Sequence, residues 1–145
     1  MIEVKQIDVQ LTYPIRKAIL RKGMSLSHKM AGDEHIDSIH LGVYDGGRLN
    51  CVGSFIGVNS NLFLEKEQYQ LRGMASAFEA QGKGYGKYLL SEAESILRKN
   101  NVKIIWCNAR VTAVNFYKKM GYQVKGTEFN VPEVGKHFVM YKNIE

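Results

Sequence analysis

The chain has 145 residues, which is enough for one domain that buries about two thirds of its extended surface. Hydrophobic residues make up 45% of it and charged residues 23%, as in an ordinary globular domain, and no apolar run approaches the roughly eighteen residues of a membrane span. Its net charge of +6 is compatible with nucleic acid, but lysine and arginine are scattered and no nucleic-acid-binding motif is present. We therefore expect neither a nucleic-acid partner nor a membrane.

The two cysteines, Cys51 and Cys107, lie in apolar stretches with strand character. This setting favours reduced, buried thiols over a disulfide framework or a metal site. The N-terminus lacks the charged, apolar and small-residue succession of a signal peptide. We expect a single cytoplasmic domain over residues 1–145 that binds no metal.

The first elements are a strand and a helix. Residues 1–8 alternate in polarity as a strand does. Thr12 and Pro14 predict the start of a helix, because a capping hydroxyl is followed by proline in the first turn, and Gly23 is expected to end it. Residues 24–36 are polar and irregular.

Three strands should follow. The segments 38–44 and 49–58 are predicted to form a hairpin, because the Asp-Gly-Gly-Arg sequence at residues 45–48 tolerates the positive φ angles of a tight turn. Residues 69–76 are the next predicted strand, which leads into a glycine-rich loop.

Two amphipathic helices are predicted in the second half. The first begins after the glycine-rich loop, and its apolar stripe consists of Tyr85, Tyr88, Leu89, Ala93, Ile96 and Leu97. A short apolar strand at residues 103–107 comes next. The second helix is expected to be capped by Thr112 and stopped by Gly121, and two final strands, about 122–129 and 137–143, complete the chain.

The glycine-rich loop, residues 81–86, is the strongest functional signal. Amides at a helix start have no internal partner and bind anions, and Gly82, Gly84 and Gly86 remove side chains that would block a diphosphate, while Lys83 adds charge. The spacing is not that of the dinucleotide fingerprint, and the residues after the last glycine are not those of a P-loop. A flexible turn before a surface helix remains the alternative.

Gln81-x-x-Gly84-x-Gly86, preceded by Met74-Ala75-Ser76, resembles the acetyl-CoA-binding signature of the GNAT superfamily of N-acetyltransferases. The resemblance extends along most of the chain and implies an α/β fold with a mixed, mostly antiparallel sheet of about seven strands flanked by about four helices. It implies acetyl-CoA as cofactor and coenzyme A as product. The cofactor-binding residues it implies are Met74, Ala75, Ser76, Gln81, Gly82, Lys83, Gly84, Tyr85, Gly86, Asn108 and Tyr117.

The resemblance also implies catalytic roles. Tyr117 matches the tyrosine of the family's F-Y-x-x-x-G motif, and a phenol that is protonated at neutral pH can donate a proton to the leaving thiolate. Its position in the helix's apolar stripe also fits a core tyrosine. His137 is a candidate base for the acceptor ammonium, with Glu79, Glu128 or a water chain as alternatives.

The acceptor side of the cleft should include residues from the first helix and the irregular segment after it. Arg16, Arg21 and His28 are the candidates for substrate binding, although each also fits a solvated surface. The expected acceptor is a primary amine of a small molecule or a protein, and a homodimer is possible. A non-catalytic acyl-CoA-binding module of the same fold is the alternative function.

Overall fold

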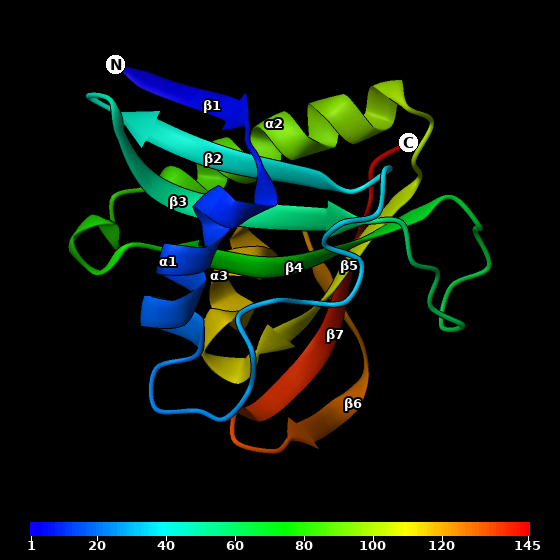
Figure 1. Ribbon diagram of the computed structural model, residues 1–145. Coiled ribbons are helices and arrows are strands. Elements are labelled where there is room, and N and C mark those ends of the chain that lie inside the picture. The colour runs from blue at the N-terminus through cyan, green and yellow to red at the C-terminus, as the bar shows by residue number, and fades with distance from the viewer.

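A computed structural model describes all residues 1–145, and its centre is one seven-stranded sheet (Figure 1). The strands are β1 (Ile2–Gln6), β2 (Ile39–Asp45), β3 (Arg48–Ile56), β4 (Gln68–Ser76), β5 (Ile104–Arg110), β6 (Gln123–Val131) and β7 (Gly135–Asn143). Their order in the sheet is β1-β2-β3-β4-β5-β7-β6, and every neighbouring pair is antiparallel except β4 and β5. The predicted mixed, mostly antiparallel sheet is confirmed.

Three helices cover the sheet. They are α1 (Tyr13–Ile15), which continues as one π-helical stretch through Arg16–Leu20, α2 (Tyr85–Lys99) and α3 (Val114–Lys119). In Figure 1, α1 lies in front of the sheet and α2 behind it. The expectation of about four helices was too high, because residues 24–36 form turns and no second helix. None of these helices combines the length and apolar character needed to cross a bilayer.

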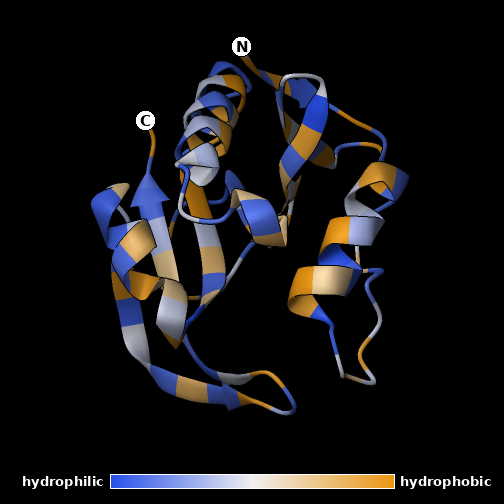
Figure 2. Ribbon diagram, turned by 90° about the vertical axis from the view of Figure 1, so that its left-hand side faces the viewer, coloured by the Kyte–Doolittle hydropathy of each residue, from blue (hydrophilic) through white to orange (hydrophobic).

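The core lies mainly between the sheet and α2. Leu89, Leu90, Ala93 and Leu97 of α2 are fully or almost fully buried against β-strand residues, whereas Tyr88, which the apolar stripe included, is 48% exposed. Hydrophobic and hydrophilic residues alternate along the helices and strands in short patches (Figure 2). Both cysteines are free and buried, as the sequence predicted.

The predicted hairpin is confirmed, but both predicted hydroxyl caps were wrong. Gly46 and Gly47 have φ angles of +60° and +80° in the β2–β3 turn. The hydroxyl of Thr12 donates to the carbonyl of Val9 at 2.6 Å instead of capping α1. Thr112 lies inside a 3-10 turn, and α3 begins two residues later without a side-chain cap. A hydroxyl before an apolar run signals a cap only when a regular α-helix starts there.

A β-bulge in β4 reverses which side chains face which layer. Val52 pairs with Ala75 and Ser54 with Arg72, so β4 carries one extra residue at this point, and Gly73 adopts a φ of +62°. Before the bulge, Leu71 faces the α2 side of the sheet, and after it Ala75 faces the α1 side although both numbers are odd. The bulge therefore redirects the end of β4, where the site is built.

Candidate active site

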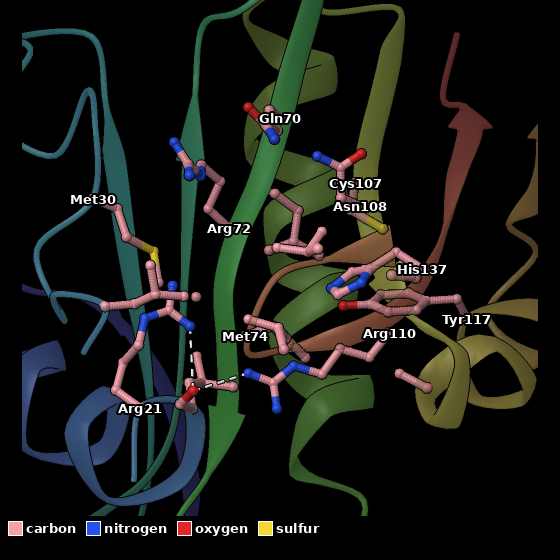
Figure 3. Close-up of a pocket in the computed structure, with 18 residues that line it drawn as sticks. Arg21, Met30, Gln70, Arg72, Met74, Cys107, Asn108, Arg110, Tyr117 and His137 are labelled. Carbon is pink, nitrogen blue, oxygen red and sulfur yellow. Dashed lines mark hydrogen bonds between the residues drawn. The ribbon is translucent and has the colours of Figure 1, made fainter. Parts of the chain in front are cut away.

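A cleft opens where β4 and β5 separate. The two parallel strands pair only from Gln68–Ile104 to Leu71–Cys107, and beyond this point the facing edge of β4 has no partner on β5. The cavity between them has a volume of about 390 Å³. Figure 3 shows the polar side chains that line it, which come from β4, β5, β7, α3 and the end of the first helix. An unpaired strand edge inside a cavity can bind an extended polar ligand as an added strand does.

The glycine-rich loop lies at the end of this strand edge and begins α2. Gly82 and Gly84 have φ angles of +78° and +84°, and a Cβ atom at either position would meet nothing within 4 Å. Gly84 is the residue before the first helical residue, so the amides of the first turn remain without helical partners. The loop thus presents open space and free N–H groups, which is what a diphosphate requires.

Gly86 has a different role from the other two glycines. A Cβ atom at this position would lie 2.9 Å from Cζ of Phe116 and 3.0 Å from Cε of Met74. Its missing side chain therefore lets α2 pack closely on α3 and β4. The sequence pattern treated all three glycines as one ligand-binding set, whereas the structure divides them into two open loop positions and one packing position.

The side chains of the other predicted loop residues differ in burial and in hydrogen-bond partners. The side chain of Tyr85 is buried, and its hydroxyl donates to Asp45 at 2.7 Å, a bond that lowers the pKa of that carboxyl. Gln81 donates to the carbonyl of Ser76 at 3.3 Å and so joins the loop to the end of β4. Lys83 is exposed. For Tyr85, only the backbone amide is available to a ligand at the helix start.

The three predicted residues of β4 occupy different depths. Met74 lines the cleft, Ala75 packs against Val52 beneath it, and Ser76 pairs with Cys51 at the strand end. Any contact of these residues with a ligand would therefore use main-chain groups of β4, with the side chain of Met74 as the cleft wall.

Tyr117 of α3 reaches the cleft from the core side. Its side chain is only 6% exposed, yet it is part of the cleft lining (Figure 3). Burial is the main reason that the pKa of this phenol is raised well above its ordinary value, and the neighbouring thiols of Cys107 and Cys51 add to the shift. The hydroxyl therefore stays protonated over a wide pH range and suits a proton donor rather than a base.

His137 and Asn108 lie on the two strands beside β4. His137 is 6% exposed, lines the cleft and pairs directly opposite Arg110. Its Nδ1 is 2.8 Å from the carbonyl of Gly135. Because a carbonyl only accepts, Nδ1 is the donor in this contact, and in the neutral ring Nε2 is the acceptor. Asn108 is exposed at the cleft wall.

Arg16 is not at the acceptor side of the cleft but inside the protein. Its side chain is fully buried, and its two terminal nitrogens bond Asp33 at 2.7 and 3.0 Å. The same group donates to Ser54 at 2.9 Å and to the carbonyl of His28. The structure corrects the expectation of a substrate contact, because this guanidinium has no exposed surface with which to touch a ligand.

Of the other two predicted substrate-binding residues, only Arg21 lines the cleft. The ring of His28 lies edge-on against Tyr13 at a centroid distance of 4.7 Å and does not line the cleft, so the structure does not place it with the other candidates. Arg21 does line the cleft.

Arg72 and Arg110 also line the cleft and were not among the sequence-based candidates. Arg72 is on β4 before the bulge, and Arg110 is the last residue of β5. Strand alternation assigns each of them to one face of the sheet, but their place in the cleft depends on where β4 and β5 separate. The sequence did not reveal where that separation begins.

The comparisons with known proteins agree with this geometry. The family model described as "Acetyltransferase (GNAT) domain" matches residues 37–124, which is more than half of the chain. The chain is 38% identical over 145 residues to YitI of Bacillus subtilis, which carries the name of an uncharacterized N-acetyltransferase; the match covers 99% of this chain and 97% of the relative.

Solved structures share the fold at low sequence identity. ElaA of Escherichia coli superimposes with a TM-score of 0.80 at 17% identity, covering 99% of this chain and 100% of that one. An aminoglycoside 6'-N-acetyltransferase complexed with coenzyme A gives a TM-score of 0.77 at 12% identity, covering 99% and 97%.

Proposed function

Because this chain belongs to the GNAT family of acetyltransferases, we propose that it transfers the acetyl group of acetyl-CoA to a primary amine by direct attack. The observation that carries the proposal is the cleft between β4 and β5, whose unpaired strand edge leads into an open glycine loop at the start of α2. The acceptor is a small molecule or an exposed amine of a protein.

The residues present fit coenzyme A. A thioester cofactor supplies an activated acetyl group and a thiolate leaving group. Gly82 and Gly84 leave the space that a diphosphate needs, and the first-turn amides of α2 face it. The free edge of β4 beyond Leu71 offers main-chain partners to the amides of a pantetheine arm, and Asn108 lies across the cleft from it. The amide of Met74 or a neighbour polarises the thioester carbonyl.

Tyr117 is the proposed general acid. Its raised pKa keeps the phenol protonated, so it can donate to a thiolate whose ordinary pKa is about 8.5. The position of Tyr117 on the cleft wall, at the core side, also shields the departing sulfur from solvent.

His137 is the proposed route for the acceptor's proton. Since Nδ1 is held by the carbonyl of Gly135, Nε2 is left to accept a hydrogen bond from the amine or from an intervening water. A proton taken up at this nitrogen leaves the amine nitrogen with a free electron pair for attack on the acetyl carbon.

The first test is acetyl-CoA binding by titration calorimetry. Gly84→Asp should reduce the affinity at least about tenfold, because it places a side chain and a negative charge where the diphosphate would sit. Gly126→Asp is the matched control: Gly126 also has a φ of +84° and open space at its Cβ position, but it lies on β6 outside the cleft. Equal binding by the wild type and Gly84→Asp would remove the loop from the proposed site.

A second test separates an enzyme from an acyl-CoA-binding module. Thiol release from acetyl-CoA is followed with a panel of primary amines at fixed protein concentration. Amine-dependent release supports transfer. Binding of acetyl-CoA without release for any amine would favour the binding module.

A further inference from the structure

Three arginines converge on one side of the cleft. Arg21 follows the first helix, Arg72 lies on β4 and Arg110 ends β5, and all three line the same cavity (Figure 3). The cavity lining contains no aspartate or glutamate. Three positive charges around one partly enclosed space repel one another unless an anion lies between them.

None of the three guanidinium groups is neutralised by a carboxylate. Arg21 donates to the carbonyls of Ser27 and Leu20, Arg110 donates to the same Leu20 carbonyl at 3.0 Å, and Arg72 donates to the carbonyl of Ala31 at 3.3 Å. No ion pair joins any of them to an acidic side chain. Main-chain carbonyls hold the groups in place but leave their charge and several N–H donors free.

The pKa shifts of the three guanidinium groups are consistent with charges that no carboxylate neutralises. Burial lowers the pKa of Arg21, Arg72 and Arg110, and for Arg21 the charges of Arg110 and Arg72 lower it further. The charge of Asp33 acts in the opposite direction on the pKa of Arg72, but this carboxylate is hydrogen-bonded to Arg16 and forms no ion pair with the three cleft arginines. Glu133, which lies between the cleft-lining residues Val131 and Val134, accepts two hydrogen bonds from Ser25. A ligand anion is the partner that the cleft itself does not supply.

The cluster formed by Arg21, Arg72 and Arg110 is separate from the expected position of the diphosphate. Arg72 precedes the bulge and faces the α1 side of the sheet, as its paired residue Ser54 does. The glycine loop follows the bulge, beyond Ser76, and begins α2 behind the sheet. A cofactor held at the loop with its sulfur near Tyr117 leaves the arginines on the acceptor side.

We propose that the acetyl acceptor carries an anionic group, a carboxylate or phosphate, which Arg21, Arg72 and Arg110 bind while the amine points toward the thioester. This rests on the proposed acetyltransferase function. Polycationic acceptors such as polyamines and aminoglycosides are disfavoured, because their additional positive charges would enter a cleft that already carries three.

Anion binding is tested first, without turnover. Inorganic phosphate and succinate are titrated separately into the coenzyme A-loaded protein and into the free protein. Arg21→Gln, Arg72→Gln and Arg110→Gln should each weaken anion affinity roughly 10- to 100-fold, because each removes charge-assisted hydrogen bonds. Arg98→Gln is the control: it removes the same charge at the end of α2, where Arg98 bonds the carbonyl of Ile144 outside the cleft.

Acceptor preference is tested with matched amines. Beta-alanine is compared with beta-alaninamide, and phosphoethanolamine with ethanolamine, in the thiol-release assay. The anionic member of at least one pair should have a kcat/KM more than about tenfold higher, and the Arg72→Gln variant should lose that preference mainly through KM. The pair that responds identifies a carboxylate or a phosphate as the recognised group.

Three results would overturn the proposal. They are equal turnover of anionic and neutral amines, anion affinity that is unchanged in all three arginine variants, and a fall in coenzyme A affinity that matches the fall in phosphate affinity. The last would assign the cluster to a cofactor phosphate. Failure of acetyl-CoA to bind, or of every amine to release thiol, would reject the proposed function alone, because anion binding to the free protein needs neither cofactor nor turnover.

Discussion

The buried pair of Arg16 and Asp33 predicts a large loss of stability in Asp33→Asn. The two side chains are 0% and 5% exposed and form two parallel hydrogen bonds. The substitution leaves the guanidinium buried beside a neutral amide, and Nε of Arg16 already has no hydrogen-bond partner. Removing one member of a buried pair typically costs about 3–5 kcal/mol, a large part of the ~5–15 kcal/mol that stabilises a domain. The melting temperature should fall by about 6–20 °C.

Urea unfolding followed by circular dichroism measures this loss. Asp37→Asn is the control, because Asp37 is exposed and has no ion pair. The double variant Arg16→Met/Asp33→Leu should recover much of the stability, since it removes both charges instead of isolating one. A loss below about 1 kcal/mol in Asp33→Asn would refute the reasoning, because it would mean that the guanidinium finds water or another partner.

The pair also has a defined pH dependence. Burial by itself raises the pKa of Asp33, but hydrogen bonds from Arg16 and from the Met30 amide outweigh it and leave the pKa below its ordinary value. The unfolded chain therefore binds the proton first as the pH falls. The stabilisation is complete above the ordinary carboxyl pKa of about 4 and is lost as the pH falls through the lower, folded value. Asp33→Asn should be less sensitive to acid over that range.

Three further predictions concern the cleft and the core. Tyr117→Phe should lower kcat about 100-fold or more in the thiol-release assay. Tyr122→Phe is the control, because it also removes a buried hydroxyl but should leave kcat nearly unchanged. Equal effects of the two substitutions would reject Tyr117 as the general acid. Glu133→Ala removes two hydrogen bonds to Ser25, so hydrogen exchange of the amides of residues 24–30 should accelerate without a change in acetyl-CoA affinity. Unchanged exchange would mean that this contact does not hold the segment in place. Burial raises the pKa of the Cys51 thiol to about 11 and that of the Cys107 thiol to about 12. The thiols of the unfolded chain therefore ionise first as the pH rises, and the free energy of unfolding should fall above about pH 9. A urea midpoint that stays constant up to pH 11 would contradict this.

Much of the fold was predictable because local and tertiary requirements agree. The stripe of α2, the turn at Gly46 and Gly47, and the strand patterns each depend on a few neighbouring residues. The structure keeps them, apart from the exposed Tyr88, with shifts of one to three residues at the strand ends. The loop at the start of α2 was predictable for the same reason, because glycines directly before an amphipathic helix are a signal carried by a few neighbouring residues.

The acceptor side was not predictable in the same way, because it depends on contacts far apart in the chain. Nothing beside Arg16 in the sequence indicates that Asp33 and Ser54 will bury it. The convergence of Arg21, Arg72 and Arg110 likewise requires the first helix to lie over the separating ends of β4 and β5. Residue type suggested an anion-binding role for arginine, but only the topology decided which arginines face the cleft.

Arg16 links the core to the cleft through the bulge in β4. A Cβ atom on Gly73 would lie 2.8 Å from Nε of Arg16, so the guanidinium occupies the space that a side chain at this position would need. The missing side chain of Gly73, which adopts a positive φ, therefore leaves room for the buried guanidinium, and the next residue, Met74, lines the cleft. Since the proposed thioester contact uses the amide of Met74 or a neighbour, any change that releases Arg16 should weaken acetyl-CoA binding even where the protein remains folded.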